Sequence, residues 1–268
     1  MSTKIAGILN VTPNSFSDGG KFLESAAAIQ HAEKLIRDGA DIIDVGAEST
    51  APDATSVECD EEWKRLENVL PEVVRLAHDS GVEVSIDTRN AKTAARALEC
   101  GVDYINDQGG LLDIDMSAVA AQSTVPIIIM HNLGIPTSRA HTAEGPPEKL
   151  VDEMLEWFMR RVDILLSKGV QRERIILDPG LGFGKRPEYS WYIVRNIHKF
   201  MNMGFKTYVG HSRKSMFSAI PVALEDRDAP TAMLSMFLVQ KGVDFLRVHD
   251  VALTKTAQKI ASLLGDAT

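Results

Sequence analysis

One pattern recurs six times in this chain and limits its fold more than any other feature. An amphipathic helical stretch ends at a glycine, and a short apolar strand follows. Glycine directly after a helix is the expected left-handed cap, so each of these residues indicates where a helix passes into a strand. The six glycines are Gly39, Gly81, Gly101, Gly169, Gly204 and Gly242.

Two further apolar runs, residues 4–11 and 125–130, raise the predicted number of strands to eight. Eight alternations of strand and helix in 268 residues favour a (β/α)8 TIM barrel, which takes about 250 residues. A doubly wound open sheet is the alternative. No linker or change in composition divides the chain, so we expect one α/β domain over residues 1–268. The later helices are predicted at residues 147–167, 189–203, 230–241 and 251–264.

Charge and hydropathy exclude several classes of function. The formal net charge is −8, which argues against a general role on nucleic acid or on a membrane surface, because both need a positive field. No apolar run approaches the 18 or so residues of a spanning helix, and no signal-peptide core opens the chain. Cys59 and Cys100 show no metal-binding spacing and are expected to be reduced structural thiols. We expect a cytoplasmic protein.

Polar residues stand at the carboxyl end of every predicted strand. In a (β/α)8 barrel these ends meet at one rim, where the active site lies. Each residue by itself is equally well explained as a turn residue that ends a strand. As a set, they favour a ligand pocket. The set comprises Asn10, Asp44, Glu48, Asp87, Asn106, His131, Asp178, His211, Ser212, Lys214, Arg247 and His249.

Residues 175–185 carry the strongest single motif, Ile-Ile-Leu-Asp-Pro-Gly-Leu-Gly-Phe-Gly-Lys. A buried strand ends at Asp178, and Pro179 with Gly180 then turns the chain. The glycines that follow allow a ligand to approach the backbone closely, and Lys185 adds a positive charge. A solvated turn is the plain alternative, because a glycine-rich loop alone is a weak signal.

The residue types on the rim indicate which ligands it can bind. Carboxylate and amide side chains from three strands, Asp87, Asn106 and Asp178, suit a flat heterocycle with donor and acceptor edges. The cationic side chains suit a phosphorylated group, and an asparagine oxygen suits Mg²⁺ held mainly by phosphate. The cationic set is Lys214, Arg247 and His249, and the asparagine is Asn10. There is no Ser-His-Asp order, Walker loop or His-Glu-x-x-His motif.

Eight motifs in order resemble those of the dihydropteroate synthase family and cover almost the whole chain. They lie at residues 8–20, 44–50, 85–88, 105–107, 130–131, 178–185, 212–215 and 247–251. The family is a (β/α)8 barrel that joins 7,8-dihydropterin-6-ylmethyl diphosphate to p-aminobenzoate, giving dihydropteroate and diphosphate in folate synthesis. The resemblance implies that loops 12–22 and 48–60 are mobile lids. We also expect a homodimer.

The resemblance assigns a role to each candidate residue. Asn10 would bind Mg²⁺, Ser212 would lie near the aminobenzoate, and Arg247 with His249 would hold the diphosphate. Asp178, Lys214 and Arg247 would act in catalysis, because the leaving diphosphate needs cations and an anionic aspartate can stabilise a cationic pterin. The pterin would be held by Thr50, Asp87, Asn106, Asp178 and Lys214.

One departure from the family's pattern affects the second substrate. After Glu48-Ser49-Thr50 the family has Arg-Pro-Gly, whereas this chain has Ala51-Pro52-Asp53. A synthase with Ala51 would use p-aminobenzoate weakly or recruit another cation, for which the candidates are Lys21, Arg65 and Arg186. Two other functions stay open at this point: a pterin-dependent methyltransferase that serves a corrinoid protein, and a repurposed pterin-binding paralogue.

Overall fold

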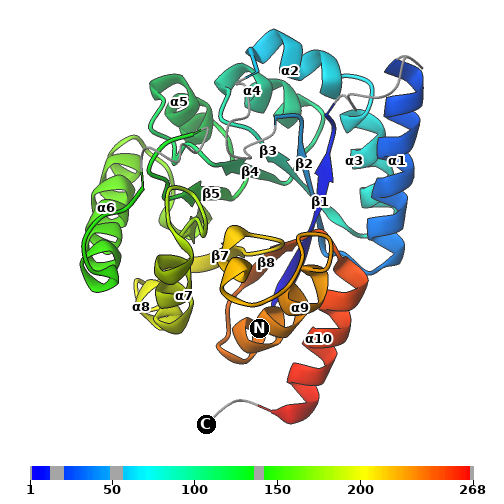
Figure 1. The fold of residues 1–268 in the computed structure, drawn as a ribbon. Coiled ribbons are helices and arrows are strands. Elements are labelled where there is room, and N and C mark those ends of the chain that lie inside the picture. The colour runs from blue at the N-terminus through cyan, green and yellow to red at the C-terminus, as the bar shows by residue number, and fades with distance from the viewer. Residues whose placement is uncertain (1, 13–20, 49–56, 136–141, 266–268) are drawn as a thin grey trace.

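Eight parallel strands close into a barrel in the computed structural model, in the order of the sequence from β1 to β8 (Figure 1). The structure describes residues 2–12, 21–48, 57–135 and 142–265. The barrel confirms the predicted (β/α)8 fold and excludes the open sheet. The strands are β1 (Lys4–Asn10), β2 (Ile42–Gly46), β3 (Glu83–Asp87), β4 (Tyr104–Asp107), β5 (Ile127–Met130), β6 (Ile175–Asp178), β7 (Lys206–Gly210) and β8 (Phe245–Val248).

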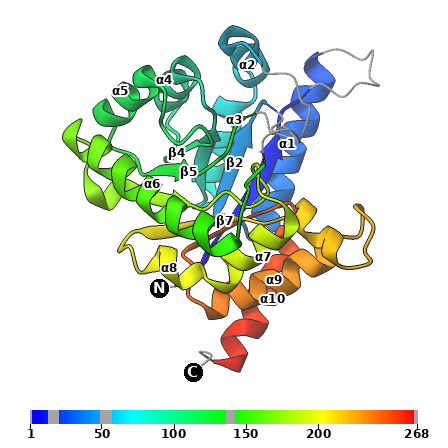
Figure 2. The ribbon, with the colours of Figure 1, turned by 60° about the vertical axis from the view of Figure 1, so that its left-hand side comes forward.

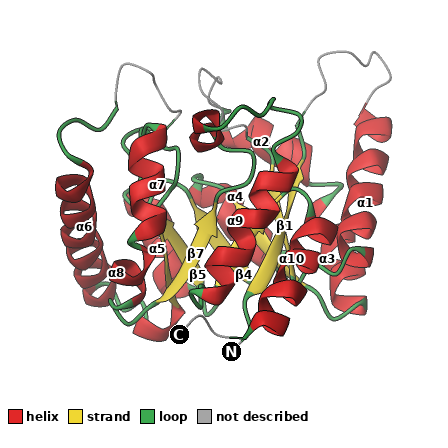
Figure 3. Ribbon diagram, turned by 60° about the horizontal axis from the view of Figure 1, so that its bottom comes forward, coloured by secondary structure: helices red, strands yellow, loops and turns green. Residues whose placement is uncertain are grey.

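The helices surround the barrel on the outside, as the side view shows (Figure 3). They are α1 (Lys21–Arg37), α2 (Cys59–Leu66), α3 (Leu70–Asp79), α4 (Ala91–Glu99), α5 (Ile114–Gln122), α6 (Pro147–Ser167), α7 (Pro187–Arg195), α8 (Ile197–Met201), α9 (Asp228–Gln240) and α10 (Val251–Leu264), with short 3-10 turns at Arg172–Arg174 and Ser215–Ala219. Within the described ranges, no helix is long and apolar enough to cross a membrane.

The six glycines that punctuate the sequence all have left-handed backbones, with φ between 71° and 92°. The predicted cap at each of them is confirmed. The single helix predicted at residues 189–203 is wrong, because α7 and α8 meet at Asn196, whose side chain donates to the carbonyl of Tyr192 at 2.9 Å. Such side-chain bonds compete with the helical ladder. Helix α9 begins at Asp228, two residues before the predicted start at Pro230, since proline is tolerated in the first turn.

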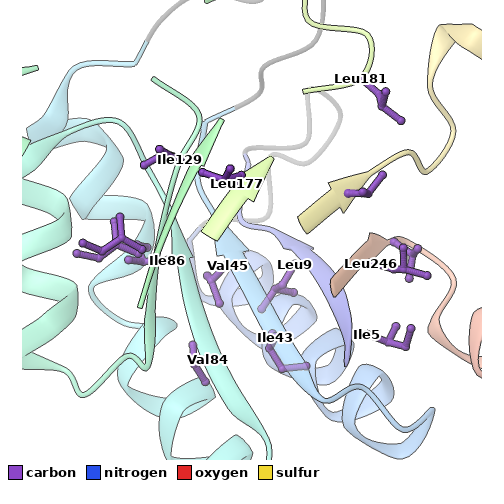
Figure 4. Packing of buried hydrophobic residues seen from close by; sticks show 14 of the residues in the cluster. Ile5, Leu9, Ile43, Val45, Val84, Ile86, Ile129, Leu177, Leu181 and Leu246 are labelled. Carbon is purple, nitrogen blue, oxygen red and sulfur yellow. The ribbon is translucent and has the colours of Figure 1, made fainter. Parts of the chain in front are cut away.

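The strands sort their side chains by the period of two that a pleated strand imposes. Alternate residues, such as Ile5, Leu9, Ile43, Val84 and Leu246, pack outside the barrel in the large core beneath the helices (Figure 4). A separate cluster fills the inside of the barrel. It consists of Ala6, Ile42, Tyr104, Ile128, Ile176, Tyr208 and Phe245.

Two residues beyond this inner cluster, the same pleat brings polar groups to the next layer of the barrel interior. Ile42, Tyr104, Ile176 and Phe245 are followed two positions later by polar residues. Those residues are Asp44, Asn106, Asp178 and Arg247. The barrel is therefore apolar in its middle layer and charged toward the carboxyl ends of its strands, and this layer forms the floor of the site.

Candidate active site

A cavity of about 1010 Å³ opens at the carboxyl ends of the strands. This end of the barrel faces the viewer in Figure 1 and is seen obliquely in Figure 2. Thr50, which the resemblance assigns to the pterin, lies outside the described residues, as does Ala51. The other predicted site residues all line the cavity: Asn10, Asp87, Asn106, Asp178, Ser212, Lys214, Arg247 and His249.

Arg247 joins two buried carboxylates at the floor of the cavity. Its Nε donates to Asp44 and its Nη2 donates to Asp87 at 2.6 Å. Asn106 donates through Nδ2 to the same Asp44 at 3.2 and 3.3 Å. Burial and the neighbouring Asp44 raise the pKa of Asp87 to about 7, although Arg247 opposes this change. This aspartate can therefore change its charge near neutral pH.

Gln108 is a cavity residue that the sequence analysis did not find. It follows β4 and its Nε2 donates to both oxygens of Asp87, at 2.6 and 2.7 Å. Its position two residues after Asn106 places it on the inner face of the barrel, so the period of two was the available signal. Phe183 and Arg227 also line the cavity without having been assigned a role.

Asp178 is held by the loop that follows it. The backbone N–H of Gly180 donates to Oδ1 at 2.7 Å, and burial raises the pKa of the carboxyl to about 6. Gly180 has a φ of 62°, and a Cβ there would lie 2.1 Å from the carbonyl oxygen of His131. Only glycine fits at this position, which explains part of the motif at residues 178–185.

Lys185 does not face the cavity, contrary to what its place beside the glycines indicated. Its Nζ is buried inside the loop and donates to the carbonyls of Gly180, His131 and Phe183 at 2.9, 3.0 and 3.3 Å. Burial lowers the pKa of this ammonium to about 7. Lys185 thus shapes the loop, and the cation on the ligand side of Asp178 is Lys214.

Lys214 lies over the ring of Phe183, with Nζ 4.0 Å from the ring centroid. Burial and the nearby Arg247 lower the pKa of Lys214 to about 8, although Asp178 and Asp87 oppose the change. A lysine with a pKa of 8 and an aspartate with a pKa of 6 are both mostly ionised at pH 7. Asp178 and Lys214 therefore give the cavity an anion and a cation that interact with each other.

Ser212 and His249 form a hydrogen-bonded pair that also lines the cavity. The Ser212 hydroxyl lies 2.9 Å from Nδ1 of His249 and accepts from the His249 backbone N–H at 3.2 Å. Burial, together with Arg213 and Arg247, lowers the pKa of His249 to about 4. The imidazole is therefore neutral at pH 7, and it offers a ligand a hydrogen bond without a charge.

Glycine at two inward strand positions leaves room for the cavity. Gly46 and Gly210 lie in register with Asp87 and Arg247 on the neighbouring strands. A Cβ at position 46 would come within 3.3 Å of the Asp87 Cβ, and one at position 210 within 4.0 Å of Asp178 Oδ2. A side chain at position 46 would press on Asp87, and one at position 210 would occupy space beside Arg247 and Asp178.

Other polar strand ends have structural partners. Asp107 accepts from the backbone N–H groups of Gly109 and Leu111 at 2.6 and 2.7 Å. His131 packs edge-on against Trp157, and burial lowers its pKa to about 3. His211 is fully buried, with Nε2 2.8 Å from the Ser235 hydroxyl. For these residues, the explanation as structural elements of the rim is the correct one.

Two of the three cations suggested as substitutes for the family's arginine are occupied elsewhere. Arg65 donates to the carbonyl of Ala47 at 2.9 Å, and Arg186 pairs with Glu188 at 2.9 Å. Neither lines the cavity. The side chain of Lys21 lies outside the described residues. Arg227 does line the cavity, and its Nε has no partner in the described part of the chain.

Taken together, these features define a (β/α)8 barrel with a polar, charged cavity at the end where enzymes of this fold carry their active sites. The charged groups come from the ends of several strands, as is usual for catalysis in this fold. Within the described ranges, no cluster of three metal-ligating side chains is present. The site can bind and orient substrates and stabilise charge.

Comparison with known proteins identifies the family. The model of the family "pterin binding enzyme" matches residues 6–249. The dihydropteroate synthase of Clostridium beijerinckii is 40% identical over 98% of this chain and 94% of its own length. The crystal structure of the Anaplasma phagocytophilum enzyme, with bound 6-hydroxymethylpterin-monophosphate, is 62% identical, with a TM-score of 0.93 over 98% of this chain and 100% of that one.

The chain therefore belongs to the pterin-binding enzymes and, among them, to the dihydropteroate synthases of folate biosynthesis, which are transferases that form a carbon–nitrogen bond. A further relative, the probable bifunctional folylpolyglutamate synthase/dihydropteroate synthase of Haloferax volcanii, is 39% identical over 97% of this chain. The chain spans 30% of that longer protein's length.

Proposed function

We propose that the chain condenses 7,8-dihydropterin-6-ylmethyl diphosphate with p-aminobenzoate, and that Asp87, Asn106, Asp178 and Lys214 hold the pterin. The observation that carries this proposal is the lining of the cavity, where carboxylates and an amide from separate strands and the Lys214 ammonium from the loop after β7 surround one space. A pterin has hydrogen-bond donors and acceptors around its edge, and this mixed set of side chains complements both. Thr50 is proposed to join them from the second loop.

We propose that Arg247 and His249 bind the diphosphate. Arg247 uses Nε and one Nη2 bond for Asp44 and Asp87, and a guanidinium has five N–H groups. The remaining donors are available to phosphate oxygens. His249 is neutral at pH 7, and with its Nδ1 accepting from the Ser212 hydroxyl it would carry its proton on Nε2 and donate one hydrogen bond.

The chemistry needs charge stabilisation rather than a nucleophilic side chain. When the C–O bond to the diphosphate breaks, negative charge grows on the leaving group and positive charge on the pterin. Arg247 and Lys214 can stabilise the first, and ionised Asp178 can stabilise the second. The amine of p-aminobenzoate then forms the C–N bond and loses one proton, which the departing diphosphate can accept. Enclosure within the barrel strengthens each of these interactions by excluding water.

Asn10 is the residue we propose for Mg²⁺. Its side chain is exposed at the end of β1, lines the cavity and makes no hydrogen bond to another described residue. One free amide oxygen fits an ion that takes few protein ligands and binds mainly phosphate and water. When bound, Mg²⁺ would supply positive charge beside the diphosphate. Asn10→Ala should raise the Mg²⁺ needed for half-maximal turnover more than it weakens binding of a pterin that lacks phosphate.

For p-aminobenzoate, we propose a place near Ser212 and Phe183, beside the wall that carries Arg227. Arg213 also lines the cavity, but its guanidinium is bound to both oxygens of Asp228 at 2.7 Å. Arg227 spends Nη1 on the carbonyls of Arg213 and Lys214 and keeps Nε free of partners among the described residues. Arg227 is therefore the residue that we propose binds the carboxylate of p-aminobenzoate, in place of the family's arginine at position 51.

A homodimer in the cytoplasm is proposed for the assembled protein. Leu253, Ile260 and Leu264 lie on one stripe of α10 and are 37%, 44% and 64% exposed, and Met233 on the adjacent α9 is 70% exposed. Such a stripe is typical of a contact between subunits. Sedimentation velocity should give a dimer that Ile260→Glu dissociates, whereas Leu112→Glu, at an exposed site elsewhere, should leave it intact.

The decisive experiment is a coupled assay of diphosphate release from the pterin diphosphate, with and without p-aminobenzoate. The proposal expects release that depends on p-aminobenzoate and forms dihydropteroate. Release that is independent of p-aminobenzoate, or none at all with an intact pterin site, would contradict it.

A further inference from the structure

Among the described residues, the hydrogen bonds of the Gln108 side chain all go to one group, the Asp87 carboxylate. Gln108 is 7% exposed, and its Nε2 lies 2.6 and 2.7 Å from the two Asp87 oxygens. Oε1 has no hydrogen-bond partner among the described residues. Because an ionised carboxylate only accepts, the amide turns its NH₂ toward Asp87, and these two hydrogen bonds orient the side chain.

Arg247, the other donor to Asp87, must divide its hydrogen bonds among several acceptors. It also donates to Asp44, and in the proposed function it binds the diphosphate. A bound diphosphate carries several negative charges, which would offset the positive charge of the guanidinium. Arg247 would then stabilise the ionised form of Asp87 less. Gln108 is neutral, so its hydrogen bonds to Asp87 are not offset by the charge of the diphosphate. The backbone supports its position, since Asn132 Nδ2 donates to the Gln108 carbonyl oxygen at 2.7 Å.

We propose that Gln108 is a positioning residue that keeps Asp87 ionised and turned toward the pterin, whether or not Arg247 is engaged by diphosphate. The inference rests on the proposed function, because it requires that Asp87 binds the pterin as an anion. It adds to the site a residue that neither the sequence motifs nor the family comparison assigned.

The groups around Asp87 set the direction of the expected effect. Burial, Asp44 on β2 and Glu62 on α2 favour the protonated carboxyl, whereas Arg247 on β8 and the N–H of Gln108 favour the ionised form. The pKa of Asp87 is about 7 with all of them present. Removing the amide donor should raise this pKa further, and about one unit is a tenfold change in the protonation equilibrium.

The test compares Gln108→Met, which keeps the size but removes the donor, with Asn132→Ala, which removes the support of the loop but keeps the amide. The Asp87 carboxyl is titrated by ¹³C NMR in the free protein, and kcat/KM for the pterin diphosphate is measured from pH 6 to pH 8.5. For Gln108→Met we expect a pKa about one unit higher, kcat/KM about tenfold lower at pH 6, and a return to within about twofold of the wild type at pH 8.5.

Two outcomes would overturn the inference: an unchanged Asp87 titration in Gln108→Met, or a loss of activity that is the same at every pH. Asn132→Ala keeps the amide and only loosens its support, so it should give a smaller shift in the same direction. If Gln108→Met fails to fold, Gln108→Glu keeps the shape, replaces the donor with a second carboxylate and should shift the titration further in the same direction. A wild-type protein without turnover would contradict the proposed function, while the NMR titration would still decide the role of Gln108.

Discussion

The two ends of the barrel interior use the same residue types in different ways. At the amino end, Lys4 pairs with Glu83, and the Tyr104 hydroxyl donates to Glu83 at 3.0 Å. At the carboxyl end, Arg247 pairs with Asp44 and Asp87. The Lys4 and Glu83 side chains are 41% and 39% exposed, whereas Asp44 and Asp87 are 0% and 8% exposed.

The difference in burial explains why one end is structural and the other functional. The amino-end cluster balances one cation with one carboxylate near water, where an ion pair contributes about 0 to 1 kcal/mol. The carboxyl end keeps excess carboxylates away from water, and burial raises the pKa of Asp87 to about 7 and of Asp178 to about 6. A chain bears that cost where ligand binding needs unscreened charge.

Arg247→Met should have the largest effect. It leaves two buried carboxylates without their cation, which costs about 3 to 5 kcal/mol of unfolding free energy, and it should abolish turnover. The control is Lys4→Met at the amino end, expected to change stability by no more than about 1 kcal/mol and to keep normal turnover. Urea unfolding at pH 7.5 and the diphosphate-release assay measure both. Equal stability of the two variants would refute the distinction between the ends.

Asp178→Asn should lower turnover at least about a hundredfold, because losing one partner of a buried charged set costs about 2 to 5 kcal/mol. Lys214→Ala should do the same. Glu83→Gln at the amino end should leave turnover unchanged. Near-normal turnover in Asp178→Asn or in Lys214→Ala would show that the pterin site has been wrongly assigned.

Asp178→Asn also tests the sign of the pH dependence. The folded pKa, about 6, lies above the usual value of 3.8, so the stability contributed by this group is present below about pH 4 and is lost as the pH rises through 6. Relative to the wild type, the variant should therefore gain about 2 kcal/mol of stability between pH 4 and pH 7. A relative loss over that interval would mean that burial does not dominate at Asp178.

Ala51→Arg should raise kcat/KM for p-aminobenzoate about tenfold, because a hydrogen bond to a charged group is worth about 1.5 to 3 kcal/mol. Affinity for the pterin should stay almost unchanged. The matched variant is Arg227→Met, which should lower kcat/KM for p-aminobenzoate if Arg227 meets the carboxylate. No change with Ala51→Arg would mean that another cation already fills this role at the carboxyl end.

The smallest effect is expected for Tyr104→Phe at the amino end. The hydroxyl bonds to Glu83 at 3.0 Å and to Lys4 at 3.3 Å, and a net hydrogen bond contributes about 0.5 to 1.5 kcal/mol. Thermal unfolding should register a loss of about 1 kcal/mol, with unchanged kinetic constants. A change in kcat would connect the two ends of the barrel and contradict their separation.

Local signals in the sequence were enough to predict the barrel architecture. The six left-handed glycines and the apolar runs predicted all eight strands, and the polar residue at each strand end predicted the rim. These features depend on neighbours in the chain, such as a helix cap or the alternation of a strand. The break at Asn196 was missed because a single side-chain hydrogen bond to Tyr192 decides it.

The sequence could not sort the rim into ligand-facing and structural residues. Lys185 and Lys214 both stand near glycine-rich loops or strand ends, yet one ammonium faces three carbonyls and the other faces the cavity. His211 and His249 follow neighbouring strands, and only His249 lines the cavity. The direction of each side chain depends on contacts with elements far away in the chain.

By itself, the sequence determined the barrel, its eight strand ends and the set of polar residues from which the site is drawn. Only the tertiary structure decided which charges meet: Arg247 reaches Asp44 across 203 positions of sequence and Asp87 across 160. It also decided the protonation of those groups, because a pKa depends on burial and on the distance to other charges. Those quantities exist only once closure of the barrel brings β8 next to β1 and encloses the floor of the site.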